Sequence, residues 1–254
     1  MSEPMFLDAG RATLPEIERF IERVPFAILP VGSTEQHGPH LPTNTDTLIA
    51  ERMALEIAKK SCGLVLPAVP LGYAWVWRDV PATLTLRFDT YMRMIRDVAE
   101  SLDRWGIHAV YVVSGHGSNP QPIKHALREL IHDQLDIKML YGMYGGLKEM
   151  LAEADSKPWH DDIHAEEIET SLMLAIAPEL VHMDRAAADY PPVPPDYGKS
   201  ELSMGNFMRT GVFGDPTSAT AEKGERWISL AADRSATLWQ GFLARHGLIP
   251  GEDK

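Results

Sequence analysis

The sequence has few cysteines, no long apolar run and fewer basic than acidic residues, and each of these features excludes some classes of protein. It has one cysteine, Cys62, so no disulfide can form within the chain, and a reducing compartment suits it. No stretch approaches the roughly 20 apolar residues of a membrane-spanning helix. The 24 basic residues are outnumbered by 36 acidic ones, and the formal net charge of −12 argues against nucleic acid or an anionic membrane as a partner.

Other signals of targeting or of several domains are also missing. The amino-terminal segment lacks a basic stretch followed by an apolar one, which predicts no signal peptide and a cytoplasmic protein. The chain has 254 residues, of which 44% are hydrophobic and 24% charged, values typical of a folded globule with one large core. Because no repeat, low-complexity block or linker stands out, we predict one domain over residues 1–254.

Short apolar runs alternate with helical patterns along the chain. The runs are short, rich in β-forming residues and closed by glycine or proline, as buried strands are, and they span residues 26–32, 64–70, 109–115 and 137–142. Between them apolar residues recur at helical spacing, in the sets Ile49–Met53–Ile57, Met94–Val98–Leu102–Trp105 and Ile123–Leu127–Ile131. This alternation predicts an α/β fold with a mostly parallel sheet covered on both faces.

The carboxyl-terminal part of the sequence is less regular. Residues 189–207 hold four prolines, which predicts a long surface excursion. A final helix is expected at about 220–245, with Ala231, Leu238 and Phe242 on its apolar stripe.

Ligand-type side chains follow the first strand, in GSTEQHGPHLPTNTD (32–46). In extended chain, Glu35 and His37 point to the same side about 6–7 Å apart, a spacing that suits two ions better than one. Such ion pairs lie about 3.5–4 Å apart, and Asp46 is the nearest carboxylate that could reach both. The alternative is a polar turn in which Asp46 is the N3 acid of a capping box that begins at Thr43.

A second polar segment, VSGHGSN (113–119), follows the third strand. Glycines on both sides of His116 let its side chain and backbone approach a ligand closely. The segment is not a dinucleotide fingerprint, because the third glycine is missing and Pro120 follows, and the chain has no GxSxG elbow of a serine hydrolase. The alternative is a turn histidine without a functional role.

The third segment, WHDDIHAEEIETSLMLAI (159–176), opens a helix with an apolar stripe. Acids suit the first turn of a helix, but five of them crowd around His164, namely Asp161, Asp162, Glu166, Glu167 and Glu169. Glu169 lies beside the apolar stripe, where an unpaired charge is costly, so it is the first candidate for metal binding and Glu167 the second. We expect Asp162 and Glu166 to be solvated. Histidines and carboxylates without cysteine suit Zn²⁺, Mn²⁺ or Fe²⁺.

Four motifs, in order STEQHGPHLPTNTD, GHGSN, HAEEIETS and GDPTSATAEKG, resemble the creatininase (creatinine amidohydrolase) family over about residues 25–235. The resemblance implies a three-layer α/β/α sandwich with a mostly parallel central sheet, and a homo-oligomer, with a hexamer favoured. It implies two divalent metal ions per chain, zinc first, with manganese or iron as alternatives. Glu35 and His116 would hold one ion, His37 and Glu169 the other, and Asp46 would bridge them.

The same resemblance implies a chemistry, in which a hydroxide that bridges the metals attacks a carbonyl carbon. His164 would stand beside the carbonyl as a proton carrier, and His164 and Glu167 are our candidate catalytic residues. The substrate carries over less well, because creatininase has a glutamate where this chain has Ser118.

Creatininase also has a tryptophan–aspartate pair where this chain has His160 and Asp161, with Trp159 one place early. Together with Ser118, these three residues are candidate substrate contacts. Further candidates are Trp75, Trp77 and Arg78 in the segment 72–86, which would form an aromatic wall for a flat or cyclic polar substrate. The alternative for the two tryptophans of 72–86 is packing at a subunit interface.

These observations predict a dinuclear metal hydrolase that acts on a small, cyclic amide. A ring-opening hydrolase of a cyclic ketone in sugar or inositol catabolism is an alternative, because the same ligands serve either bond. A formamide deformylase is another, and a metal-binding scaffold without activity is a non-catalytic one.

Overall fold

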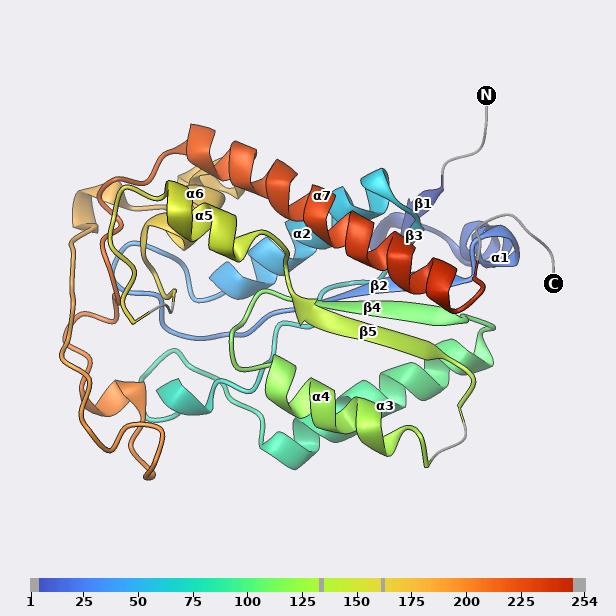
Figure 1. Ribbon diagram of the computed structural model, residues 1–254, viewed down its shortest axis with the longest axis horizontal. Coiled ribbons are helices and arrows are strands. Elements are labelled where there is room, and N and C mark those ends of the chain that lie inside the picture. The colour runs from blue at the N-terminus through green and yellow to red at the C-terminus, as the bar shows by residue number, and fades with distance from the viewer. Residues whose placement is uncertain (1–4, 133–134, 161–162, 249–254) are drawn as a thin grey trace.

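The computed structural model describes residues 5–132, 135–160 and 163–248 (Figure 1). Its centre is a sheet of five parallel strands in the order β1-β3-β2-β4-β5. The strands are β1 (Phe6–Asp8), β2 (Phe26–Val31), β3 (Gly63–Val65), β4 (Ala109–Ser114) and β5 (Lys138–Met143). Every residue of β2 and β4 is buried, as expected for central strands of a parallel sheet covered on both faces.

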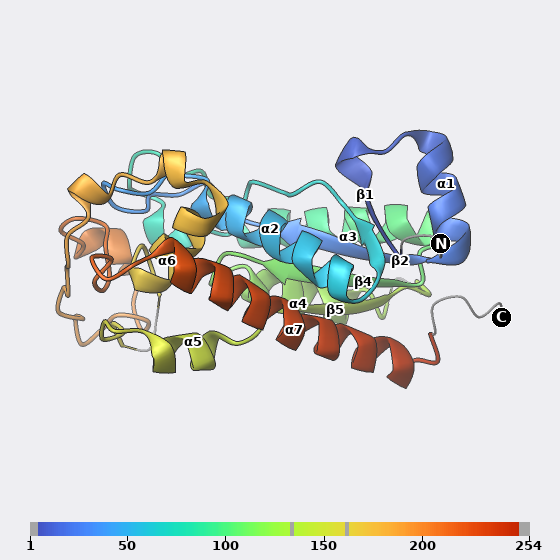
Figure 2. The same cartoon turned by 90° about the horizontal axis from the view of Figure 1, so that it is seen from above.

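Helices cover both faces of the sheet. They are α1 (Leu14–Arg23), α2 (Thr45–Lys60), α3 (Phe88–Arg104), α4 (Pro120–Glu129), α5 (Leu147–Glu153), α6 (Glu167–Ile176) and α7 (Ala221–Arg245). In Figure 1, α2, α5, α6 and α7 lie on one side of the strands, and α3 and α4 lie on the other. Seen from above, α2 and α7 run over the same face of the sheet (Figure 2). The predicted three-layer α/β/α fold is thus confirmed.

The sequence patterns missed some elements and overextended others. Strand β1 and helix α1 were not predicted. Strand β3 ends at Val65, well before residue 70, because Pro67 and Pro70 have no amide hydrogen to give to a neighbouring strand. Val69 between these prolines still pairs with β2, since its amide donates to the Pro30 carbonyl at 3.0 Å.

Three residues expected on buried stripes are exposed. Helix α3 buries Tyr91, Ile95, Ala99 and Leu102, and it ends at Arg104, so Trp105 is 53% exposed. Ile131 lies beyond the end of α4 and is 77% exposed. Leu238 faces away from the core side of α7, whose buried stripe includes Ala231 and Phe242 as predicted.

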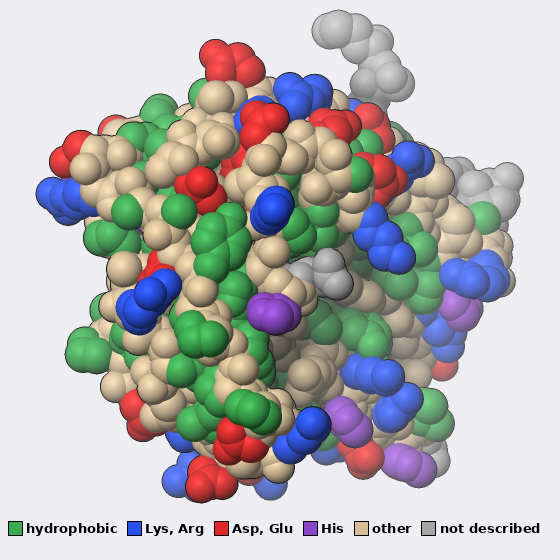
Figure 3. Space-filling model, turned by 60° about the vertical axis from the view of Figure 1, so that its left-hand side comes forward, with side chains coloured by type: hydrophobic (Ala, Val, Ile, Leu, Met, Phe, Trp, Pro, Cys, Tyr) green, Lys and Arg blue, Asp and Glu red, His purple; other side chains and the backbone are tan. Residues whose placement is uncertain are grey.

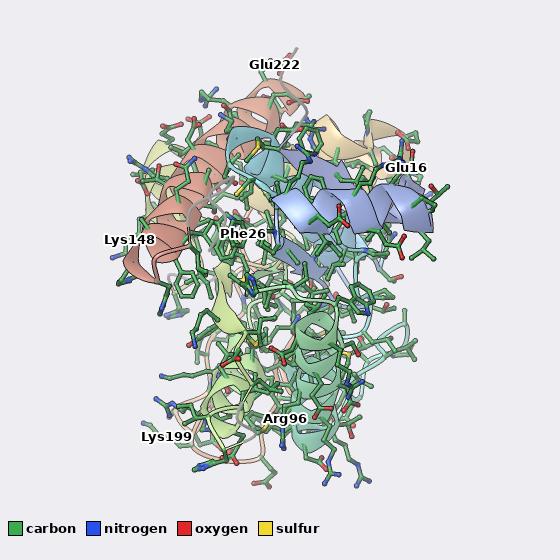
Figure 4. The ribbon with its side chains drawn as sticks, turned by 90° about the vertical axis from the view of Figure 1, so that its right-hand side faces the viewer. Glu16, Phe26, Arg96, Lys148, Lys199 and Glu222 are labelled. Atoms are coloured by element: carbon green, nitrogen blue, oxygen red, sulfur yellow. The ribbon has the colours of Figure 1, made fainter. Side chains whose placement is uncertain are left out.

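The core between the layers is apolar and rich in aromatic rings. Phe26 at the start of β2 points inward, whereas Glu16 of α1 and Lys148 of α5 lie on the outside (Figure 4). The Phe26 ring meets the edge of the Trp239 ring, with centroids 6.5 Å apart. Trp239 Nε1 also donates to the Cys62 carbonyl at 3.1 Å, which ties α7 to the start of β3.

The topology creates one natural place for a ligand. Strands β2 and β4 are neighbours, but the chain leaves β2 for α2 on one face of the sheet and leaves β4 for α4 on the other (Figure 1). Ligands in open α/β sheets bind beyond the strands' carboxyl ends, where neighbouring connections diverge in this way. No helix in the described ranges is long and apolar enough to cross a membrane.

Candidate metal centre

Five predicted ligands converge beyond the carboxyl ends of β2 and β4. They come from the loop after β2, the first turn of α2, the loop after β4 and the first turn of α6, and they are Glu35, His37, Asp46, His116 and Glu169. All five are buried, and none is more than 5% exposed. Neighbouring parallel strands thus bring together side chains that lie up to 134 positions apart in the sequence.

Asp46 lies at the centre of this cluster. Its Oδ1 is 3.1 Å from His37 Nε2, and its Oδ2 is 3.0 Å from His116 Nδ1. Ser33 Oγ donates to Oδ2 at 2.8 Å. The capping alternative is wrong, because Asn44 is the N-cap of α2 and no side chain caps that end. The two carboxylate oxygens face different histidines, as a bridging ligand requires.

The cluster divides into two groups that share Asp46. Glu35, Asp46 and His116 form one, and His37, Asp46 and Glu169 form the other. Within each group one ligand atom per residue lies within 4.8 Å of the others, close enough to hold one cation. These are the two ligand sets that the family resemblance implied. The same criterion admits a third combination, Glu35 with His37 and His164.

Hydrogen bonds behind the two histidines orient them as metal ligands. His37 Nδ1 lies 3.2 Å from the Glu35 carbonyl oxygen, and His116 Nε2 lies 3.1 Å from the Tyr73 carbonyl oxygen. A carbonyl only accepts, so each of these ring nitrogens carries the proton and donates. When either ring is neutral, its opposite nitrogen therefore has the lone pair and faces the carboxylates, which is how metal-binding histidines are held.

The carboxylates of the cluster have no lysine or arginine among the described residues to balance their negative charge. Glu35 Oε2 is buried without a hydrogen-bond partner in the described part of the chain, although His116 Nδ1 is 3.2 Å away. Across the described ranges, every ion pair of Glu35, Asp46 and Glu169 is with a histidine, never with lysine or arginine. Buried carboxylates without balancing cations are costly, so this donor set fits divalent metal ions.

Protons take the place of cations when no metal is bound. Burial works against the charged form of His37, but Asp46 outweighs it and raises the pKa of His37 to about 10. Likewise burial opposes charge on His116, and Glu35 and Asp46 raise its pKa well above the ordinary value. Burial raises the pKa of Glu169 to about 7. These shifts are those of a site that lacks positive charge.

His164 stands beside the cluster rather than within either group. Its ring stacks on Trp77, with centroids 4.5 Å apart, and its other neighbour is His37, also at 4.5 Å. His164 Nδ1 lies 3.7 Å from Glu35 Oε1. Burial, reinforced by His37, lowers the pKa of His164 well below the ordinary value. A neutral imidazole is therefore held next to the ligands.

A cavity of about 420 Å³ opens onto the cluster. Figure 3 shows a hollow in the face that carries the strand-end loops, with hydrophobic side chains beside it. Apart from the ligands and His164, its walls are mainly apolar and consist of Val76, Trp77, Met143, Leu147, Ile163, Tyr197 and Met204. Ser118 and Gln121 add polar side chains to this lining outside the cluster, and Tyr197 and Trp77 each carry one hydrogen-bonding group. The cavity therefore suits a small substrate with few charges.

Two candidates from the aromatic segment do not reach this cavity. Trp77 lines it and is buried inside the chain at 1% exposure, so the subunit-interface alternative is wrong for Trp77. Trp75 instead carries the Arg78 guanidinium over its ring at 3.9 Å, and Arg78 also donates to the Glu201 carbonyl. Neither Trp75 nor Arg78 is a lining residue.

The candidates around residue 160 have different surroundings. Trp159 is buried behind the cavity wall, where it packs against Phe213 and donates from Nε1 to the Pro191 carbonyl at 2.8 Å. His160 is exposed, with its ring against the edge of Trp159. Asp161 lies outside the described residues. Among the departures from creatininase that the structure describes, Ser118 alone lines the cavity.

The structure does not bring Glu167 to the cluster. Its carboxylate is turned to the far side of α6, where it accepts from the Ser156 amide at 2.7 Å and from Lys223 Nζ at 2.5 Å. Glu166 is not solvated as expected, because it is the N-cap of α6 and accepts from two amides of its first turn. The apolar stripe already ranked Glu169 first, and the directions of the side chains now place Glu166 and Glu167 outside the cluster.

The sequence patterns missed three residues at the site. Gln36 lies between two predicted ligands and is bonded to His164, but an uncharged amide within a turn gave no signal. Tyr197 and Met204 come from the proline-rich excursion 189–207, which folds back over the cavity. Composition predicted that this segment is irregular but not what it covers.

The sequence and structure match proteins of known class. The model of the family described as creatinine amidohydrolase matches residues 10–239. A mycofactocin precursor peptide peptidase of Mycobacterium ulcerans is 31% identical over 82% of this chain and 82% of its own length. A creatinine amidohydrolase of Pseudomonas putida is 30% identical over 89% of this chain and 92% of its own. A solved structure of creatininase with manganese covers 93% of this chain and 97% of that one, with a TM-score of 0.79 and 27% identity.

Proposed function

This chain belongs to the creatininase family of hydrolases, and we propose that it cleaves a C–N amide bond of a small, cyclic, uncharged substrate with the help of two divalent metal ions. The family assignment confirms the resemblance drawn from the four motifs. The observation that carries the proposal is Asp46, whose two oxygens face the two separate ligand groups.

The two ligand groups give each ion its own set of side chains. Glu35, Asp46 and His116 would hold one, and His37, Asp46 and Glu169 the other. Zinc or manganese suits these imidazole and carboxylate ligands. Bound there, the ions would lower the pKa of water towards neutrality and polarise the substrate carbonyl.

The other side chains would position the substrate. His164 is the group that faces both the ligands and the cavity, so it would contact the reacting amide. Trp77 holds the His164 ring by stacking and offers the rest of its surface to the cavity. Met204 and Tyr197 would exclude water from the opposite side. Ser118 and Gln121 would provide hydrogen bonds that orient the substrate.

The lining favours an amide over a polyhydroxylated ketone. A sugar or inositol ketone buries several hydroxyl groups, and each of them needs a hydrogen-bond partner. Outside the cluster the described lining offers two polar side chains, Ser118 and Gln121, and two aromatic ones that each carry one polar group, Tyr197 and Trp77, among five apolar ones. A peptide amide is the second candidate, because the apolar wall also suits a hydrophobic residue next to the bond and the peptidase relative is 31% identical.

The proposal is tested by turnover of the metal-loaded protein. The screen contains creatinine, hydantoins, formamides, short apolar peptides and cyclic inositol ketones. We expect release of an amine or ammonia from a cyclic amide. Amine release from peptides alone would favour the second candidate, and acid release from the ketones alone would contradict amide cleavage.

Substitution of His164 tests the assignment of the site. In His164→Ala we expect bound metal to be retained and kcat to fall by about 10²–10³-fold, the range for loss of one group that stabilises charge developing on the substrate. His108→Ala is the matched control, because His108 is exposed at the opposite end of β4. Unchanged turnover in His164→Ala would remove this residue from the reaction.

A further inference from the structure

His164 is held more tightly than a residue that only contacts substrate. Trp77 lies over one side of its ring and His37 lies beside it, both with centroids at 4.5 Å. Its main chain is fixed as well, because the Phe213 amide donates to the His164 carbonyl at 3.0 Å. With the plane of the ring fixed, the remaining variable is which ring nitrogen carries the proton.

The side-chain amide of Gln36 determines which nitrogen of the His164 ring carries the proton. Gln36 Nε2 lies 2.7 Å from His164 Nε2, and Gln36 Oε1 accepts from the Gly38 amide at 3.0 Å. Because the Gly38 amide can only donate, the Gln36 side chain cannot be turned round. Gly211 leaves room for this arrangement, since a Cβ at that position would lie 2.0 Å from Gln36 Oε1. The Gln36 NH₂ group therefore faces the imidazole.

We propose that Gln36 is a positioning residue that makes His164 Nε2 a hydrogen-bond acceptor, so that the imidazole proton sits on Nδ1, on the side of Glu35. An NH₂ group can only donate, so the nitrogen that it meets must offer a lone pair. In the neutral ring the proton then belongs to the other nitrogen, which is 3.7 Å from Glu35 Oε1. The catalytic consequence rests on the proposed function, but the proton's position does not.

The three histidines of the site are thus held in opposite ways. Carbonyl oxygens accept from His37 Nδ1 and His116 Nε2, so in the neutral rings the nitrogens that face the carboxylates, His37 Nε2 and His116 Nδ1, have lone pairs and can bind metal. An NH₂ donor stands behind His164, so its Nδ1 has a proton and cannot. The third metal-capable combination, Glu35 with His37 and His164, is therefore not a metal site.

The same arrangement changes the role expected for His164. A neutral ring that presents N–H to the cavity donates a hydrogen bond to a substrate oxygen that gains negative charge. It is a poor proton carrier, because loss of the Nδ1 proton would leave an imidazolate, and a second proton on Nε2 would face the Gln36 NH₂ group. His164 therefore works as a fixed donor, a role known for neutral histidines in other enzymes.

The proton's position can be measured without turnover. The probe is zinc-loaded protein with ¹⁵N-labelled histidine, and the His164 signals are identified by their loss in His164→Ala. We expect ¹⁵N shifts of a protonated Nδ1 and an unprotonated Nε2, with neither nitrogen bound to zinc. A protonated Nε2, or zinc at Nδ1, would overturn the proposal. Failure to find a substrate would leave this measurement unaffected.

Two variants of Gln36 separate positioning from packing. Gln36→Met keeps the length of the side chain but removes the donor, so both tautomers should appear. Gln36→Glu replaces the donor by an acceptor, so the proton should move to Nε2. We expect kcat to fall about twofold or more in Gln36→Met, in proportion to the fraction of molecules whose proton has moved to Nε2, with a smaller change in KM.

The matched control is Gln240→Met. It removes a glutamine side chain on the surface of α7 that donates to the Lys60 carbonyl at the end of α2. It should change neither the His164 spectrum nor kcat. If Gln36→Met lowers kcat while the tautomer of His164 stays single and unchanged, Gln36 acts only by packing and the proposal fails.

Discussion

Glu167 and Glu169 are two positions apart in the first turn of α6, and both are buried. The Glu167 carboxylate is balanced by Lys223 Nζ at 2.5 Å and by two backbone amides. The Glu169 carboxylate accepts from the Ala165 amide at 2.5 Å and otherwise faces His37 at 3.7 Å. Glu167 on one side of α6 is therefore paired with a lysine. Glu169 on the other side adds negative charge to a cluster that contains neither lysine nor arginine among the described residues.

The difference indicates how a structural carboxylate can be distinguished from a metal-binding one. Lys223 belongs to the motif GDPTSATAEKG, and in the same motif Gly224 lets α7 approach α6, since a Cβ there would lie 1.9 Å from the Ser171 carbonyl oxygen. The motif thus joins α6 to α7 and neutralises Glu167. Nothing comparable reaches Glu169 in the described ranges, where its ionic partner is the His37 imidazole.

Loss of the shared ligand should have the largest effect. In Asp46→Asn we expect both ions to be lost, with metal affinity reduced by more than about 100-fold, the upper value for changes behind a ligand. Glu167→Gln should keep its metal, because its carboxylate faces Lys223. Metal content by elemental analysis of dialysed protein measures both variants. Full metal content in Asp46→Asn, or equal metal losses in the two variants, would contradict the separate roles that we assign to Asp46 and Glu167.

Removal of the balancing lysine should affect stability instead. Lys223→Met leaves the Glu167 carboxylate buried without its cation, and we expect about 3 kcal/mol less free energy of unfolding, the lower end of the range for broken buried pairs. Urea unfolding measures it, with metal content as the check that the cluster is intact. The double variant Lys223→Met/Glu167→Gln should recover part of the loss, and no recovery would show that the ion pair is not the cause.

The fold was predictable where the chain repeats a simple pattern. Strands β2 and β4 are continuous apolar runs, and their position in the centre of a parallel sheet is what such runs predict. Strand β1, with three residues, is too short for any pattern, and β3 is interrupted by prolines. Burial of Tyr91 rather than Trp105 depends on where α3 ends, which is a property of its packing and not of its spacing.

The site was predictable to the extent that residue type alone defines a ligand. Histidines and carboxylates just beyond strand ends predicted that Glu35, His37 and His116 would come together, because parallel strands bring those loops together. Sequence ranked Glu169 above Glu167 by its place beside the apolar stripe, but it could not show that Glu167 is paired, since its partner is a lysine more than 50 positions away. Gln36 was missed for a similar reason, because its role depends on what stands on each side of its amide.

The smallest expected effect is a pH dependence that distinguishes the two sides of α6. Burial alone would raise the pKa of Glu167, but Lys223 and the Ser156 amide outweigh it and hold the pKa below the ordinary 4.5. A depressed pKa means that the unfolded state binds more protons in acid, so this stabilisation is complete above about pH 4.5 and declines as the pH falls below it. The pair therefore stabilises the fold at neutral pH and progressively less in acid.

The measurement compares wild type with Lys223→Met in urea, both free of metal, between about pH 7 and pH 3. The protonation of His37, His116 and Glu169 is common to both proteins and cancels in the difference. We expect that difference in the free energy of unfolding to be largest at pH 7 and to shrink below about pH 4.5, because a protonated Glu167 no longer needs its lysine. A constant difference across this range would mean that Lys223 stabilises α6 through packing of its aliphatic stem and not through charge.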